Sequence, residues 1–426
     1  MPTLDPARGT GKAPCCSFCD SRNLGLIMDF GDVALAGAFV RPDQFAAEKK
    51  YPMRLHFCRD CFAVQITDKV DAQVLFQDYF YFSSAIGTLR DHFRGYAEEV
   101  TQRFLDPARA TVLEFGCNDG VLLKPLADQG IRRVIGIDPA RNVLASIDDP
   151  RLTLINGFFD EKVAAAIVAQ HGKVDMVMAN NVYAHIPDIQ GITRAVEQVL
   201  ADDGVFVFEV HYLGKVVDEM QYDMIYHEHL YYYSLVSAMA HFARYGMVVF
   251  DIKPVPIHAG SMRFYVCKQH SHHASQVSET VRELEKRERD RGFDTFETFQ
   301  RFSNDVAATR EKLLDLVSRL RAQGKRIAGY GASGRANTVI QYCGLDQRHL
   351  DFMIDDAPAK AGYFTPGSHL EIFPSKVLDG PTPPDHLLVF AWSFFDEIRK
   401  RNLRYLERGG HMILPLPEVA MFPAVD

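Results

Sequence analysis

A cluster of acid–base side chains occupies residues 222–229, in the order Tyr-Asp-Met-Ile-Tyr-His-Glu-His. A histidine can accept a proton near neutral pH, and a neighbouring carboxylate can fix its tautomer. A tyrosine can donate a hydrogen bond to a carbonyl oxygen that gains negative charge. The cluster therefore predicts proton-transfer chemistry, with Tyr226, Glu228 and His229 as candidates. A metal site is less favoured, because His227 and His229 lack the i, i+4 spacing of a helical zinc pair. A surface helix cap is the remaining alternative.

Four of the eight cysteines form two close pairs, which indicates a metal-binding module. The pairs are Cys16-x-x-Cys19 and Cys58-x-x-Cys61, and together they can supply four thiolates to one tetrahedral zinc ion. Four thiolates leave no open coordination position, so this zinc would be structural. The short segments between the pairs offer little core, and we expect the metal to hold them together. Paired thiols in place of a disulfide framework also favour a reducing compartment, and we expect a cytoplasmic protein.

A strand, a glycine loop and a helix form a predicted ligand site within residues 111–128. The strand ends in an acidic residue and turns on glycine, which brings a ligand against backbone N–H groups at a helix start. Asp138 ends the next predicted strand, where a carboxylate can bind both hydroxyls of a ribose. The loop lacks dinucleotide-site spacing and resembles motif I of the S-adenosylmethionine-dependent methyltransferases, with Asn118 in place of the middle glycine. The candidate cofactor-binding residues are Glu114, Gly116, Asn118, Asp119, Gly120, Asp138 and, from a later loop, Asn181.

Strands and helices alternate from Ala110 to about Phe208, which predicts a mainly parallel sheet. Loops at the carboxyl ends of parallel strands hold ligands in such folds. One of these loops, residues 180–187, contains His185, which we place in the pocket. A histidine bonded to a neighbouring loop is the alternative for this residue.

Aromatic and hydroxyl side chains alternate just before this sheet, as Tyr-Phe-Tyr-Phe-Ser-Ser at residues 79–84. Aromatic runs more often form core than a binding site. Two tyrosines and two serines nevertheless place hydroxyl groups beside apolar walls, which suits a polar ligand with a flat ring. Tyr79, Tyr81, Ser83 and Ser84 are therefore candidates as well.

A second strand, glycine loop and helix begins at Ile327 and has the spacing G-x-G-x-x-G from Gly329 to Gly334. The amides of such a loop can bind a pyrophosphate, and Arg335 can add a charge contact. A whole nicotinamide dinucleotide is an alternative, although the domain is short. An earlier segment, residues 258–263, has a glycine and an arginine that suit an anionic group. The candidate substrate-binding residues are His258, Arg263, Gly331, Ser333, Gly334 and Arg335.

Size and composition narrow the class of protein. A chain of 426 residues is too long for one typical core, so two or three domains are expected. A net charge of -8 and a pI near 6.1 argue against a binder of nucleic-acid backbones. No apolar run approaches a membrane-spanning length, and the polar start lacks a signal-peptide core, so no membrane partner is expected.

The order of these motifs resembles that of the sugar C-methyltransferases over nearly the whole chain. The shared pattern is paired Cys-x-x-Cys, Tyr-x-Tyr-x-Ser-Ser, Glu-Phe-Gly-Cys-Asn-Asp-Gly, Asn-Val-x-Ala-His, Tyr-His-Glu-His and a late Gly-Tyr-Gly-Ala loop. The resemblance implies a multidomain α/β protein: a disordered leader (1–13), a zinc-binding domain (14–73), a Rossmann-like class I methyltransferase domain (74–270), and a helical bridge with a Rossmann-like C-terminal domain (271–426) that helps to bind a nucleotide sugar. Ala259, where many members have glycine, and the aromatic run 231–233 depart from the family. Both departures could shift the choice of sugar.

The resemblance also implies a reaction. These enzymes use S-adenosylmethionine to methylate nucleotide-linked 4-keto-deoxysugars, and a C4 ketone makes the neighbouring C3 proton removable. By resemblance, His229 is the base, Glu228 orients it or shares protons with it, and Tyr226 is a second candidate for proton handling. Tyr81 would donate a hydrogen bond to the enolate oxygen. The nucleotide would be dTDP, GDP or CDP, and the protein a monomer or small homo-oligomer.

Two other functions stay open at this point. The chain could be an O- or N-methyltransferase, or a bifunctional enzyme that also reduces with NAD(P)H at the Gly329–Gly334 loop. It could also be a zinc-dependent scaffold or nucleic-acid binder without catalysis. The net negative charge of the chain and the cluster of acid–base side chains at residues 226–229 argue against the last function.

Overall fold

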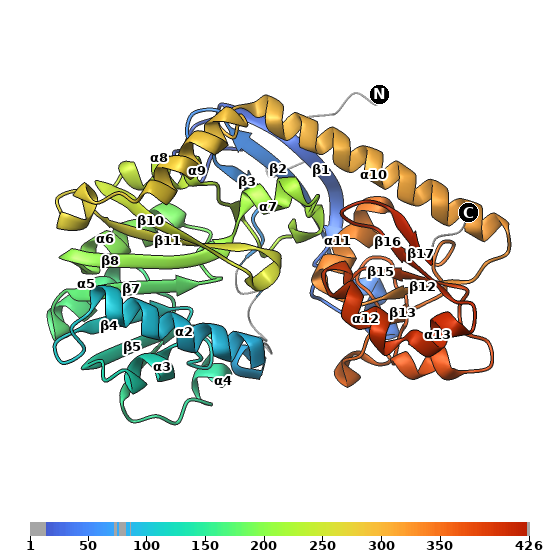
Figure 1. Ribbon diagram of the computed structural model, residues 1–426, viewed down its shortest axis with the longest axis horizontal. Helices are drawn as coiled ribbons and strands as arrows, with labels where there is room; N and C mark the ends of the chain where they lie inside the picture. The colour runs from blue at the N-terminus through green and yellow to red at the C-terminus, as the bar shows by residue number, and fades with distance from the viewer. Residues whose placement is uncertain (1–13, 72–74, 76–81, 86, 424–426) are drawn as a thin grey trace.

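The computed structural model describes residues 14–71, 75, 82–85 and 87–423, apart from the side chain of His258. The expected leader at residues 1–13 and the candidates Tyr79 and Tyr81 lie outside the described residues. The described chain forms three β-sheets, and the two larger sheets lie in separate lobes (Figure 1). This arrangement confirms the predicted multidomain α/β class.

The first sheet is antiparallel and has the strand order β1-β2-β3-β9. Its first three strands come from the cysteine-containing segment, but β9 follows the acid–base cluster directly. Ile66 N–H also donates to the Leu230 carbonyl, at 2.8 Å. The sheet therefore takes its fourth strand from beyond the expected boundary at residue 73. The strands are β1 (Leu24–Ala34), β2 (Lys50–Cys58), β3 (Val64–Ile66) and β9 (Tyr231–Tyr232).

The central sheet has seven strands in the order β10-β11-β8-β7-β4-β5-β6. Strands β6, β5, β4, β7 and β8 pair in parallel, whereas β11 is antiparallel to both β8 and β10. The chain runs from β4 to β5 on one side and later to β7 on the other, so the carboxyl end of β4 is a topological switch point where ligands bind. The strands are β4 (Thr111–Phe115), β5 (Arg133–Asp138), β6 (Leu152–Asn156), β7 (Val174–Asn180), β8 (Leu200–His211), β10 (Met247–Val255) and β11 (Ser261–Lys268).

The C-terminal sheet has six strands in the order β14-β13-β12-β15-β16-β17. Strand β12 pairs in parallel with both β13 and β15, which makes its carboxyl end a second switch point. The glycine loop begins there. The strands are β12 (Ile327–Tyr330), β13 (Met353–Ile354), β14 (Ile372–Phe373), β15 (His386–Val389), β16 (His411–Leu414) and β17 (Ala420–Phe422).

Several helices begin at a serine or aspartate whose side chain accepts a hydrogen bond from the first turn, as at Asp160, Asp188, Ser234, Ser278 and Ser333. The charged stretch after residue 271 forms α9 and α10, and α10 is about 40 Å long at 1.5 Å per residue. Helix α10 packs on β1 near its start and on the C-terminal sheet near its end (Figure 1). Among the described helices, none combines the length and apolar character needed to cross a bilayer. The helices are α2 (Gly87–Phe104), α3 (Leu123–Asp128), α4 (Arg141–Leu144), α5 (Glu161–His171), α6 (Ile189–Val199), α7 (Leu213–Asp218), α8 (Leu235–Ala243), α9 (Glu279–Asp290), α10 (Phe296–Ala322), α11 (Gly334–Cys343), α12 (Phe395–Arg401) and α13 (Leu403–Glu407).

Candidate active site

The two cysteine pairs converge on one point beside the first sheet. All four sulfur atoms, of Cys16, Cys19, Cys58 and Cys61, lie within 4.8 Å of one another. Zinc–sulfur bonds of about 2.3 Å place the sulfurs of a tetrahedral site about 3.8 Å apart, which fits this cluster. Gln65 Nε2 donates to Cys16 Sγ at 3.0 Å, and such a donor stabilises a thiolate ligand. These residues can therefore hold a structural zinc ion.

The loop after β4 takes its shape from three residues in the left-handed backbone region. Gly116, Asn118 and Gly120 have φ angles of +67°, +49° and +75°. Asparagine enters this region more readily than most residues, which explains how Asn118 can replace the middle glycine. Asn118 N–H donates to Asp138 Oδ2 at 2.9 Å, so the carboxylate at the end of β5 is held against the loop.

The carboxyl ends of β4 and β7 present two buried acceptors side by side. Glu114 Oε1 accepts a hydrogen bond from Asn180 Nδ2 at 3.0 Å. Glu114 Oε2 and Asn180 Oδ1 are buried and have no hydrogen-bond partner among the described residues. Burial raises the pKa of Glu114 to about 8. Once Glu114 releases its proton, Glu114 Oε2 and Asn180 Oδ1 are two acceptors that suit a cationic ligand such as S-adenosylmethionine, which carries a sulfonium and an ammonium group.

Asn180 was not among the residues expected to bind the cofactor; the neighbouring Asn181 was. Asn181 has a φ of +54°, and its N–H donates to the Glu209 carbonyl at 2.8 Å. Asn180 is the last residue of β7 and Asn181 follows the strand, and the side chain of Asn180 is the one bonded to Glu114. Strand alternation could have distinguished the two, because neighbouring side chains on a strand point to opposite faces.

The serines of the aromatic run lie on the cofactor loop. Ser83 N–H donates to Asn118 Oδ1 at 3.0 Å, and Ser84 N–H donates to Asp119 Oδ2 at 3.1 Å. The short helix η2 (Ser83–Ala85) therefore packs against the loop through its backbone. This contact places the expected cofactor and substrate residues next to each other.

The acid–base cluster supplies a histidine whose two ring nitrogens both have partners. His229 Nδ1 lies 3.0 Å from the Met224 carbonyl, and Nε2 lies 2.8 Å from the Tyr226 hydroxyl. A carbonyl oxygen can only accept, so this pattern assigns the ring proton to Nδ1 and leaves a lone pair on Nε2. Sequence reasoning expected a carboxylate to fix this tautomer, but the group on Nδ1 is a backbone carbonyl, which residue types cannot reveal.

His185, from the loop after β7, lies beside this histidine. The His185 ring centroid lies 5.0 Å from that of His229, and His185 Nδ1 hydrogen-bonds to the Glu228 carbonyl. Burial lowers the pKa of His185, which favours the neutral ring, and burial raises the pKa of Glu228. His227 Nε2 instead bonds to the Pro52 carbonyl of β2, at 3.2 Å. Among the described residues, the four cysteines are the only group of three or more arranged to hold a metal ion, so no metal site forms in this cluster.

The C-terminal glycine loop leads into α11. Gly331 has a φ of +93°, and a Cβ there would lie 2.7 Å from Ala391 Cβ. Ser333 caps α11 by accepting from Ala336 N–H. Arg335, expected to contact substrate, has its Nε 2.8 Å from Asp223 Oδ2 in the acid–base cluster.

Arg263 lies elsewhere and needs a correction. Its side chain is buried, with contacts to Glu209 at 2.6 Å and to Glu99 at 2.9 Å, and its guanidinium stacks 3.3 Å from the Tyr96 ring centroid. Two carboxylates already neutralise this charge, so the expected contact with an anionic substrate is replaced by a role in joining β8, β11 and α2.

His258 lies on the neighbouring helix η4 (Ile257–Ala259), whose last residue, Ala259, has a φ of +61°.

The fold and these residues define a class of protein: an S-adenosylmethionine-dependent methyltransferase with a zinc-binding module. Three family models match in succession, a zinc binding domain at residues 16–76, a methyltransferase domain at 89–251 and a C-methyltransferase C-terminal domain at 256–417. The C-methyltransferase NovU of Streptomyces niveus is 31% identical over 410 residues, which cover 96% of this chain and 97% of NovU. The chain belongs to the sugar C-methyltransferase family.

Solved methyltransferase structures resemble part of the chain. The magnesium protoporphyrin IX methyltransferase of Synechocystis PCC 6803, with bound SAH, is 14% identical with a TM-score of 0.33, over 42% of this chain and 83% of that one. The CcbJ methyltransferase of Streptomyces caelestis is 13% identical with a TM-score of 0.33, over 41% and 89%.

Proposed function

We propose that this C-methyltransferase methylates C3, next to the C4 ketone of a nucleotide-linked deoxysugar, through an enolate that His229 forms. A ring C–H is not nucleophilic, so carbon methylation needs a carbanion, and an adjacent ketone makes its formation accessible. The observation that carries the proposal is the His229 tautomer, because a proton on Nδ1 leaves Nε2 as the basic atom.

The proton then has a defined path. The proton leaves C3 and is received by His229 Nε2. The C3–H electron pair forms a double bond between C3 and C4, and the π electrons of the C4 carbonyl move onto its oxygen. The Met224 carbonyl stabilises the imidazolium because it already accepts the Nδ1 hydrogen. A tyrosine hydroxyl would donate to the oxygen that gains charge, and by family resemblance this tyrosine is Tyr81.

Tyr226 decides how the proton reaches the base. Its hydroxyl lies 2.8 Å from His229 Nε2, the atom that must become free. The hydroxyl can rotate away and let Nε2 meet the C–H bond directly. Alternatively, it passes its own proton to Nε2 while it takes the proton from C3.

S-adenosylmethionine, when held by residues at the ends of β4, β5 and β7, supplies an electrophilic methyl group for the enolate carbon. The chain's own residues contribute position. Asp138 is fixed by Asn118 N–H and Ala140 N–H, at 2.9 and 2.8 Å, and can bind the ribose. The Gly331–Ser333 loop at the second switch point can take the nucleotide phosphates.

Incubation with ¹³C-methyl S-adenosylmethionine and a panel of dTDP-, GDP- and CDP-linked 4-keto sugars tests the proposal. The methyl carbon resonance distinguishes a C-methyl from an O- or N-methyl product. We expect His229→Ala to abolish both methylation and exchange of the C3 hydrogen with deuterated water. Retained exchange without methylation would show that His229 is not the base. His171→Ala is a suitable control, because α5 ends just before β7 begins, at the amino ends of the parallel strands, whereas the cofactor loop lies at their carboxyl ends.

A further inference from the structure

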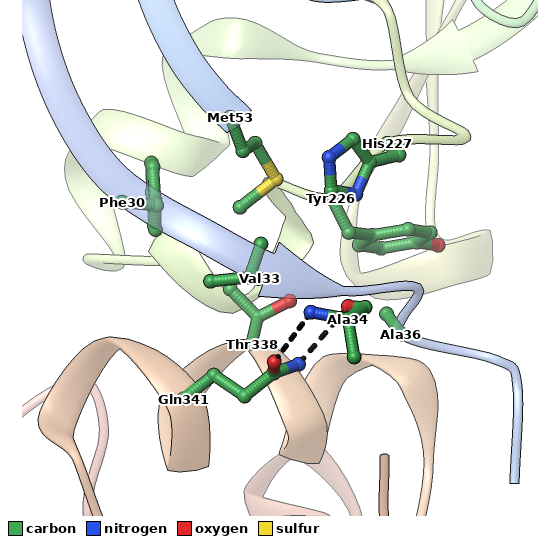
Figure 2. Close-up of a pocket in the computed structure, with 9 residues that line it drawn as sticks. All are labelled: Phe30, Val33, Ala34, Ala36, Met53, Tyr226, His227, Thr338 and Gln341. Carbon is green, nitrogen blue, oxygen red and sulfur yellow. Dashed lines mark hydrogen bonds between the residues drawn. The ribbon is translucent and has the colours of Figure 1, made fainter. Parts of the chain in front are cut away.

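Helix α11 follows the nucleotide-binding loop and contacts two other parts of the molecule. Gln341 Oε1 accepts from Ala34 N–H at 2.8 Å and Gln341 Nε2 donates to the Ala34 carbonyl at 3.1 Å, at the end of β1. Thr338 Oγ1 donates to the Ile225 carbonyl at 3.3 Å, within the acid–base cluster. Figure 2 shows Thr338 and Gln341 of α11 beneath β1, with Tyr226 on the other side of that strand. The helix therefore joins the nucleotide loop to the residues proposed for proton transfer.

Asp223 makes a deeply buried polar contact at this junction. Its side chain is 1% exposed. A single oxygen, Oδ2, accepts from Arg335 Nε at 2.8 Å and from Trp392 Nε1 at 2.9 Å. Arg335 lies in the first turn of α11, and Trp392 begins the short helix η8 (Trp392–Phe394), which follows β15. The two donors thus come from the helices that follow β12 and β15, the neighbouring strands at the switch point of the C-terminal sheet.

The chain between Asp223 and His229 is short and tightly bonded. Met224, the next residue, supplies the carbonyl that holds His229 Nδ1. Ile225 is bonded to α11 through its carbonyl, and Tyr226 reaches His229 Nε2. A displacement at Asp223 would therefore move both hydrogen-bond partners of His229.

We propose that Asp223 is a positioning residue that couples the nucleotide-binding end of the C-terminal domain to the His229–Tyr226 pair. This inference rests on the proposed function. Its consequence is that the nucleotide part of the substrate contributes to the rate of proton removal as well as to binding, because it is held by the loops that hold Asp223.

Asp223→Asn tests the coupling, because it retains the size of the side chain and removes its charge. We expect the rate of C3 hydrogen exchange to fall by about 10- to 100-fold, as small misplacements of a catalytic group do. The KM for the nucleotide sugar and the Kd for S-adenosylmethionine should change by less than about threefold, since Asp223 lies outside both proposed sites. Trp392→Phe should give a smaller loss, and the double variant should lose much less than the product of the two.

Two results would overturn the inference. One is an exchange rate in Asp223→Asn close to that of the wild type. The other is a rise in KM that matches the loss of rate, which would make Asp223 part of the binding site. If Asp223→Asn does not fold, Trp392→Phe decides by the same two measurements. If His229→Ala still exchanged the C3 hydrogen, His229 would not be the base. Slow C3 exchange in Asp223→Asn would, even then, show that Asp223 positions the 223–229 segment.

Discussion

Glu114 offers a direct test of how the cofactor end of the central sheet is built. Its usual pKa is 4.5, and in the folded protein it is about 8 because the carboxyl is buried. The folded state therefore binds a proton that the unfolded chain releases. This stabilisation is fully present below about pH 4.5 and is lost as the pH rises through 8. Between about pH 6 and pH 8 the loss amounts to about 2 kcal/mol of unfolding free energy.

Glu114→Gln removes the titration and leaves an amide of the same size. We expect the unfolding free energy of this variant, relative to the wild type, to rise by about 2 kcal/mol from pH 6 to pH 8 in the absence of S-adenosylmethionine. Urea unfolding followed by circular dichroism measures the difference, with hydrogen exchange of the β4 and β7 amides assigning the transition to the central sheet. Glu283→Gln, at an exposed position on α9, is the matched control for the loss of one carboxylate.

Saturating S-adenosylmethionine provides a second condition. We expect the ammonium group of S-adenosylmethionine to lie beside Glu114, where it would favour the carboxylate. The pH dependence of the difference in unfolding free energy between wild type and Glu114→Gln should therefore shrink or vanish when the cofactor is bound. Parallel curves for wild type and Glu114→Gln without cofactor would refute the reasoning. They would mean that Glu114 is already ionised at pH 6 and that its carboxylate, near the end of β4, is solvated rather than buried.

Two further predictions concern the proton path and the metal. Tyr226→Phe should abolish C3 exchange if the hydroxyl relays the proton. It should leave the rate of C3 exchange within about threefold of wild type if the hydroxyl only rotates away from His229. Deuterium incorporation followed by mass spectrometry separates the two routes. Zinc removal by a chelator, or Cys58→Ser, should abolish exchange as well, because β3 of the zinc module pairs with β9 directly after His229. A colorimetric chelator should release one zinc per chain, and Cys15→Ser is the control, since this exposed neighbour of Cys16 lies outside the sulfur cluster. Full exchange in metal-free protein would contradict this account.

Local patterns could predict the cofactor loop because its geometry depends on consecutive residues. The strand at residues 111–115, the turn and the acidic end of the next strand all appear where their residue types place them. The cysteine pairs were similarly predictable, since thiolate spacing alone constrains a tetrahedral site. Asn118 fits a position that favours glycine because asparagine tolerates positive φ.

Contacts between distant segments could not be predicted in this way. Arg335 looked like an anion ligand beside a glycine loop, but its partner Asp223 lies more than a hundred residues earlier in the chain. Arg263 looked similar, yet two carboxylates from other elements surround it. The partner of His229 Nδ1 is a backbone carbonyl, which every residue carries and no residue type marks. Residue types indicated which groups were present, and the tertiary fold determined which of them pair.

The pairing of β9 with β3 also limits how this protein can be recombined. A chimera that replaces only the cysteine-containing segment with that of a relative would keep a foreign fourth strand in its first sheet. The donor segment would then have to match Tyr231 and Tyr232, whose side chains are buried. Residues 222–232 and the zinc module must therefore be replaced together in a chimera. A replacement intended to change only the metal-binding part would also alter the acid–base cluster.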